Sequence, residues 1–162
     1  MSELNRVRGW AEALIALHLD ASWSFGFDNA KRRAGLCDFG RKRISVSRYL
    51  AARYDDDENH QTLLHEVAHA LAGSTAGHGP AWKRIAREIG YVGGTTHRGE
   101  TAVELAAWVG TCPAGHVVYR HRRATRPTSC ALCAPRFDPR HALTWTRREI
   151  TPATRQAAMT PR

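Results

Sequence analysis

Residues 63–71 read LLHEVAHAL, and this segment combines a strongly apolar composition with two histidines and a glutamate. Its apolar residues predict a helix that is buried on nearly every side except the one that carries His65, Glu66 and His69. Histidines four positions apart lie on one face of a helix, one turn apart, where both imidazoles can bind a single metal ion. Glu66 projects about 100° away from His65, which leaves it close enough to reach a water molecule at the metal. We therefore interpret Glu66 as a candidate catalytic base.

A third histidine follows the predicted helix. A catalytic zinc site needs three protein ligands and an open position for water. Residues 73–80 read GSTAGHGP, which supplies a helix end, a flexible turn and His78. Pro80 suits the first turn of a second helix, predicted over residues 80–89 with Trp82 on its apolar face. We expect His78 to be the third zinc ligand.

The sequence HEVAHA, followed by GHGPAWKRIAREIG, resembles the SprT-like metallopeptidase family. The resemblance extends upstream to residues 23–47 and downstream to a tail that is similar to a zinc ribbon. It implies a catalytic zinc ion bound by three ligands, His65, His69 and His78. It also implies that Glu66 is the base in peptide hydrolysis, and that the substrates are proteins bound or crosslinked to DNA.

The basic residues of the chain gather in its last third. The 162 residues carry a formal net charge of +9. Residues 1–100 hold 14 basic and 12 acidic side chains, whereas residues 101–162 hold 10 and 3. A concentrated positive charge favours a polyanionic partner, most often nucleic acid. Composition alone equally allows a basic tail that only keeps the protein soluble.

The sequence gives no sign of a membrane partner. No apolar run approaches the ~20 residues of a membrane span, and the N-terminus lacks the basic-then-apolar order of a signal peptide. We expect a cytoplasmic protein, associated with the nucleoid if it binds DNA.

The N-terminal part predicts helix and strand in succession. Apolar residues at helical spacing predict a helix over residues 3–19. Three strands are predicted over residues 23–27, 33–38 and 43–47, and we expect them to form a small antiparallel sheet. The expected fold class is α+β. It consists of the N-terminal helix, this sheet, two zinc-site helices that form a minimal zincin-like core, and a small β zinc ribbon.

The segment after the second helix, which is rich in glycine and threonine, is expected to be a loop beside the cleft. Zinc peptidases need a donor that stabilises the oxyanion of the tetrahedral intermediate. The nearest candidates are Tyr91, His97 and Arg98, and the sequence does not choose among them.

Two short motifs in the last third predict a structural zinc site. Residues 112–116 read CPAGH and residues 130–133 read CALC, which fits two knuckles around one closed tetrahedral site. In a reducing cytoplasm these cysteines are not expected to form disulfides. The predicted ligands are Cys112, His116, Cys130 and Cys133. SprT-like proteins usually carry four cysteines here, so His121 and His141 remain alternatives to His116.

The segment between the two motifs is basic. Residues 117–119 are strand-like, and four arginines follow: Arg120, Arg122, Arg123 and Arg126. No acidic residue occurs in residues 105–137. We interpret the arginines as a surface that binds phosphates, with Tyr119 or His121 available to stack on unpaired bases. The expected partner is DNA, single-stranded or at a junction, and the alternative is an ordinary solvated face.

These observations divide the chain into three parts. We expect a metallopeptidase domain over residues 1–105, a basic zinc-ribbon module over residues 106–148 and a disordered tail over residues 149–162. The predicted function is that of a zinc endopeptidase with one catalytic and one structural zinc ion, whose partners are a protein substrate and DNA. Two alternatives remain: a nucleic-acid-binding zinc protein without proteolytic activity, and a repressor-cleaving peptidase of the ImmA/IrrE type.

Overall fold

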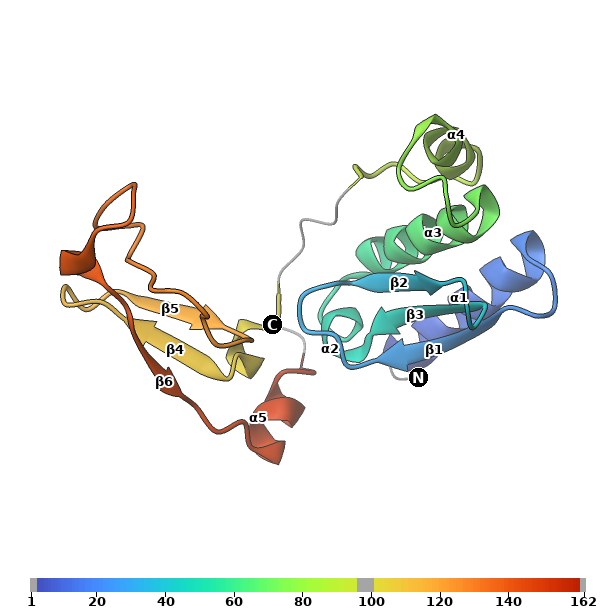
Figure 1. Ribbon diagram of the computed structural model, residues 1–162. Coiled ribbons are helices and arrows are strands. Elements are labelled where there is room, and N and C mark those ends of the chain that lie inside the picture. Colours follow the sequence, from blue (N-terminus) through green and yellow to red (C-terminus); the bar gives the residue numbers. More distant parts are fainter. Residues whose placement is uncertain (1–2, 96–100, 161–162) are drawn as a thin grey trace. The chain divides into compact units, whose positions relative to one another are not determined.

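The computed structural model describes residues 3–95 and 101–160. The chain divides into two compact units (Figure 1). The first unit comprises Met1–Thr101 and Met159–Arg162, and the second comprises Ala102–Ala158. No helix in residues 3–95 or 101–160 has the length and apolar character needed to cross a bilayer.

The first unit places helices against a three-stranded sheet (Figure 1). Its elements are α1 (Glu3–His18), β1 (Ser24–Asp28), β2 (Gly35–Asp38), β3 (Arg43–Ser47), α2 (Arg48–Ala51), α3 (Asp56–Ala72) and α4 (Pro80–Glu88). The helices and strands therefore lie within a few residues of the predicted ones.

The predicted antiparallel sheet is wrong in one pairing. The strand order is β1-β3-β2, and β1 runs parallel to β3 while β2 runs antiparallel to it. The Asp28 carboxylate accepts a hydrogen bond from the Ala30 amide at 2.8 Å and another from the Ser45 hydroxyl at 2.7 Å. The bond from Ser45 links the end of β1 to β3. Strand β2 lies on the other edge of β3, so β1 and β2 are not neighbours in the sheet.

Helix α3 is the centre of the first unit. Asp55 caps its N-terminus by accepting a hydrogen bond from the Glu58 amide at 2.8 Å. On one side Leu63 packs with Val7 of α1 and Val46 of β3. On another side, apolar residues of α3 pack with α4 in a cluster formed by Leu64, Ala68, Trp82, Ala86 and Tyr91. Burial on both sides fixes α3 between α1, the sheet and α4.

The second unit is built on a separate antiparallel sheet in the order β5-β4-β6. Its elements are η1 (Val103–Leu105), β4 (Trp108–Thr111), β5 (Val117–Arg120), η2 (Pro139–His141), β6 (Thr144–Arg147) and α5 (Pro152–Ala157). Helix α5 lies in the segment predicted to be disordered, and the structure differs from that prediction. The Thr151 side chain caps the helix and Pro152 occupies its first turn. A helix of six residues is too short to show a clear apolar period in the sequence.

Strand β2 packs against α3 so closely that only glycine fits at one position. A Cβ atom at Gly35 would lie 2.6 Å from both Cγ and Oε1 of Glu66. At Gly40, in contrast, a Cβ atom would meet the Asp38 carboxylate at 3.5 Å, which is an ordinary contact.

We expect Gly35→Ala to lower the free energy of unfolding by about 1–3 kcal/mol, because the added methyl group must displace the Glu66 side chain or the strand. The matched variant Gly40→Ala should stay within about 0.5 kcal/mol of the wild type. Urea unfolding at one fixed zinc concentration, followed by circular dichroism, measures both. Equal stability of the two variants would contradict the close packing of β2 on α3.

Candidate metal centres

Three histidine side chains of the first unit converge on one point. His65 and His69 lie on α3, and His78 lies in the turn before α4. The Nε2 atoms of His65 and His69 are 3.2 Å apart, and each lies 3.0 Å from Nε2 of His78. Zn–N bonds of 2.0–2.1 Å at tetrahedral angles would separate two ligand nitrogens by about 3.3 Å. The three ring nitrogens therefore have the spacing that one zinc ion requires.

The turn that brings His78 back depends on two glycines. Helix α3 ends at Ala72 and is capped by Gly73, whose φ of 89° is in the region that glycine tolerates, and Gly77 has a φ of 49°. The Gly79 amide then donates to the Ala76 carbonyl at 2.9 Å, and Pro80 begins α4. The sequence prediction also placed His78 in a flexible turn between two helices.

Hydrogen bonds among the three rings cannot satisfy all three Nε2 atoms at once. Each Nε2 atom is either a donor or an acceptor. Among three nitrogens that all face one another, at least two must therefore have the same role and repel. A cation that accepts a lone pair from every ring removes the conflict. Burial, together with His78, lowers the pKa of His69, which favours the neutral imidazole that binds metals.

The Trp82 side chain contacts the rings of all three histidines. Its ring centroid lies 4.8 Å from that of His65, 5.3 Å from that of His69 and 4.7 Å from that of His78. The indole is only 2% exposed. The sequence prediction assigned Trp82 only to the apolar face of its helix and missed this role. The feature of the sequence that could have indicated this contact is the position of Trp82 four residues after His78.

Glu66 follows His65 on α3, and its side chain is buried and held by β2. Its side chain is 8% exposed, lies against Gly35 and accepts a hydrogen bond from the Cys37 amide. Burial raises the pKa of Glu66 to about 7, although Arg33 and the Cys37 amide act in the opposite direction. A carboxyl group with a pKa near 7 can both accept and return a proton at neutral pH.

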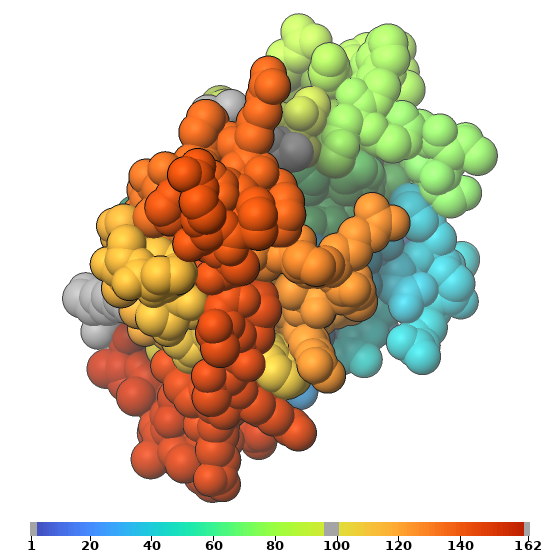
Figure 2. Space-filling model, turned by 60° about the vertical axis from the view of Figure 1, so that its left-hand side comes forward, coloured from blue at the N-terminus to red at the C-terminus, as the bar shows by residue number. Residues whose placement is uncertain are grey.

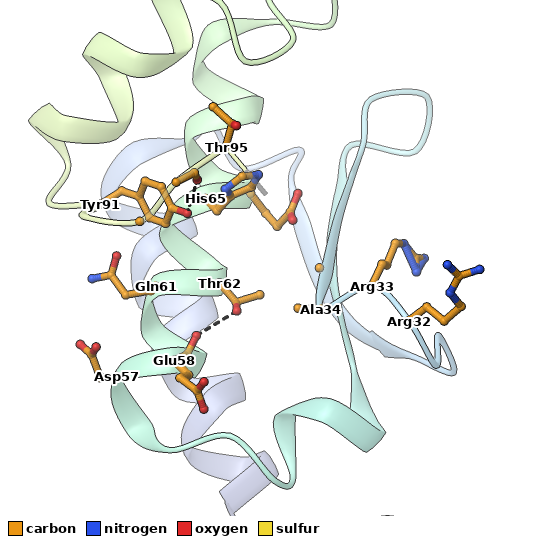
Figure 3. Close-up of a pocket in the computed structure, with 14 residues that line it drawn as sticks. Arg32, Arg33, Ala34, Asp57, Glu58, Gln61, Thr62, His65, Tyr91 and Thr95 are labelled. Carbon is orange, nitrogen blue, oxygen red and sulfur yellow. Dashed lines mark hydrogen bonds between the residues drawn. The ribbon is translucent and has the colours of Figure 1, made fainter. Parts of the chain in front are cut away.

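A cavity of about 840 Å³ opens beside His65 and Glu66 (Figure 3). Its walls come from α3, from residues 32–35 at the start of β2 and from residues 91–95 after α4. The Tyr91 side chain lies beside His65 at one end, and burial raises its pKa. The other two predicted oxyanion donors, His97 and Arg98, lie outside the described residues.

Four side chains of the second unit form another cluster. The Nδ1 atom of His116 lies 3.5, 3.6 and 3.3 Å from the sulfur atoms of Cys112, Cys130 and Cys133. Two of the sulfur atoms, those of Cys112 and Cys133, are 3.9 Å apart. A tetrahedral zinc site with Zn–S bonds of 2.3 Å would give separations of about 3.6 and 3.8 Å. The structure groups His116, and neither His121 nor His141, with the three cysteines.

The predicted arginines lie at the end of β5 and in the loop that follows. Two of them stack on aromatic rings: Arg120 lies 5.1 Å from the Trp145 ring and Arg123 lies 5.6 Å from the Trp108 ring. Arg122 and Arg126 are exposed in the same loop. Figure 2 shows this segment, drawn in light orange, at the surface of the second unit.

The aromatic partners of these arginines were missed in the sequence. Trp108 is paired with Arg120 across β4 and β5, and the Trp145 ring lies directly over Gly110, where a Cβ atom would be 2.9 Å from it. Tyr119 precedes Arg120 on β5 and therefore faces the opposite side of the sheet. The guanidinium carbon of Arg148 lies 5.3 Å from the centroid of the Tyr119 ring. The signal was one large aromatic residue in each of the three strands.

Comparison with protein-family models matches residues 6–104 to the SprT-like family. Comparison with curated proteins and with solved structures gave no match. The matched segment contains most of α1, the sheet, α3 and α4, together with the three converging histidines and Glu66. It ends before the cysteines of the second unit. The family is associated with zinc metallopeptidases. The match covers more than half of the length of the chain, and the chain therefore belongs to the SprT-like family.

Proposed function

We propose that the chain is a zinc-dependent endopeptidase that cleaves proteins bound or crosslinked to DNA, and that its second unit binds the nucleic acid. One observation carries the first part of the proposal. Three imidazole nitrogens with zinc-ligand spacing lie next to a buried carboxylate at the wall of a cavity. Zincin-like chemistry needs this combination of three ligands and a base.

Each candidate centre suits a different kind of zinc site. His65, His69 and His78 would hold the catalytic ion, and three protein ligands leave a coordination position open. Cys112, His116, Cys130 and Cys133 would hold a structural ion, because four protein ligands close the site. When bound to the three histidines, zinc supplies Lewis acidity, which lowers the pKa of a water molecule toward about 7 and polarises a carbonyl group.

Glu66 is the residue that moves the proton in this proposal. Its carboxylate takes a proton from the attacking water as the oxygen–carbon bond forms. It then returns that proton to the amine as the carbon–nitrogen bond breaks. Burial and the contact with Gly35 and the Cys37 amide hold the carboxylate in one place. The neighbouring cation Arg33 is bound to Asp28 at 3.0 Å, so its guanidinium already has a carboxylate partner.

The second unit supports binding to nucleic acid through oriented arginines. Stacking on Trp145 and Trp108 holds the guanidinium planes of Arg120 and Arg123 against the sheet, which lowers the entropy lost when they contact phosphates. The exposed ring of Tyr119 offers an additional surface for an unpaired base. Basic residues and aromatic rings together favour single-stranded DNA.

We expect Glu66→Gln to bind as much zinc as the wild type and to lose cleavage by at least about 10³-fold, because an amide cannot accept the proton. Metal analysis and cleavage of a DNA-binding protein, with and without single-stranded DNA, measure both effects. Retained cleavage in this variant would contradict the mechanism. If the wild-type protein cleaves its substrate equally well without DNA, the result would instead favour a peptidase that recognises one repressor. DNA binding by a wild type that cleaves nothing would favour a protein without proteolytic activity.

We expect the double variant Arg120→Gln/Arg123→Gln to flatten the salt dependence of binding to single-stranded DNA. Each lost phosphate contact reduces the slope of log K against log salt by about 0.7, so the pair should reduce it by about 1.4. The matched double variant Arg136→Gln/Arg155→Gln removes the same charge from exposed positions in the same unit. Fluorescence anisotropy titrations at several salt concentrations compare the two. An equal change in slope for both pairs would mean that net charge alone, and not the stacked arginines, determines binding.

A further inference from the structure

We infer that the hydroxyl group of Tyr91 donates a hydrogen bond to the substrate carbonyl oxygen as that oxygen becomes an anion. Tyr91 would then be a second catalytic residue of the peptidase, beside Glu66. This inference rests on the proposed function. Three observations support it: the position of the phenol, the contacts that hold the phenol there, and the engagement of two other donors of the cavity with other partners.

The phenol ring is packed directly against the candidate metal centre. Its centroid lies 5.3 Å from that of His65 at an interplanar angle of 78°, and 5.7 Å from that of Trp82 at 65°. The residue is 9% exposed, and its amide donates to the Ala86 carbonyl of α4 at 2.8 Å. Figure 3 shows the ring beside His65 at the same end of the cavity. The position of the hydroxyl group is therefore coupled to the position of a zinc ligand.

The turn that follows Tyr91 holds the hydroxyl group from the other side. The phenol lies so close over Gly93 that a Cβ atom there would overlap it. The hydroxyl donates its hydrogen bond to the Gly94 carbonyl at 2.7 Å. Gln61 of α3 anchors the same turn, because its side-chain oxygen accepts a hydrogen bond from the Val92 amide at 3.0 Å. A donor fixed in this way loses little freedom when it binds an oxyanion.

Two other side-chain donors of the cavity, Thr62 and Arg33, are engaged elsewhere. The three histidines would direct Nε2 lone pairs at the metal, and Glu66 acts as an acceptor. The Thr62 hydroxyl donates to the Glu58 carbonyl at 2.9 Å, and Arg33 is paired with Asp28. Figure 3 places Arg32 and Arg33 on the wall away from His65 and Tyr91.

The Tyr91 proton, in contrast, is bound to a neutral carbonyl beside the reaction site. An oxyanion is a stronger acceptor than a neutral carbonyl. Rotation of the O–H bond would transfer the hydrogen bond from Gly94 to the substrate without moving the ring. The interaction is thus stronger in the transition state than with the ground-state peptide, which is the condition for raising kcat.

The test compares Tyr91→Phe with Gln61→Met in the full-length, zinc-loaded chain. Tyr91→Phe removes the hydroxyl donor and keeps the ring, whereas Gln61→Met loosens the same turn and keeps the hydroxyl. We expect Tyr91→Phe to lower kcat by about 10²-fold with little change in KM, as the loss of one oxyanion donor typically does. The Gln61→Met variant should lower kcat/KM by less than about 10-fold, mainly by raising KM. If Tyr91 only supported the turn, the two variants would fail alike.

A binding measurement gives a second readout that does not depend on turnover. Calorimetry compares an alanine-rich peptide phosphonamidate, whose tetrahedral phosphorus carries an anionic oxygen, with the corresponding peptide amide. Tyr91→Phe should raise the Kd of the phosphonamidate by about 10²-fold and leave that of the amide nearly unchanged. In Gln61→Met both Kd values should change by the same factor.

The outcomes separate this inference from the proposed function. A wild type that cleaves the substrate, or binds the phosphonamidate only when zinc is present, upholds the proposed function. If Tyr91→Phe then matches that wild type in kcat and in phosphonamidate affinity, the inference alone is overturned. A zinc-loaded wild type that neither cleaves nor binds the phosphonamidate overturns both.

Discussion

The structure depends on one constraint, which is that three imidazole nitrogens with lone pairs are held 3.0–3.2 Å apart. Neutral histidines do not gather in this way by mutual attraction, because at least one pair of nitrogens must repel. The arrangement is enforced from outside. Helix α3 supplies two rings by its own geometry, the glycine turn returns the third, and the buried indole of Trp82 contacts all of them. A bound cation would turn this repulsion into a gain in stability, and metal binding would thereby be coupled to folding.

The same packing gives Glu66 its chemical character. A carboxylate that is 8% exposed is costly to ionise, and burial raises its pKa to about 7. Strand β2 makes the burial tolerable, because Gly35 leaves room for the carboxylate and the Cys37 amide donates to it. The hydrogen bond from Ser47 to the Ala34 carbonyl pairs that end of β2 with β3. Alternation along an antiparallel strand then directs the Gly35 and Cys37 amides toward α3. The small sheet is thus part of the site, since it supports the base from behind.

Local patterns predicted the helices, and the histidines and cysteines that they single out as candidate ligands lie close together in the structure. The apolar period of α3, Pro80 at the start of α4 and the glycines around His78 all act over a few residues, and such signals are present in the sequence itself. The features that the sequence did not reveal are non-local. The parallel pairing of β1 with β3 joins residues far apart in the chain, as does the hydrogen bond between Asp28 and Ser45, which lie 17 positions apart. The stacking of Arg120 on Trp145 likewise joins residues of different strands. Contacts of this kind depend on which elements meet, and residue spacing does not encode that.

The most direct test of the account is diffraction at the zinc absorption edge from crystals of the zinc-loaded protein. The account predicts an anomalous peak that is shared by the Nε2 atoms of His65, His69 and His78, with the Glu66 carboxylate nearby but not bound to the metal. A second, separate peak is expected among Cys112, His116, Cys130 and Cys133. A peak only at the cysteine cluster, or a His78 ring turned away from α3, would contradict the central claim.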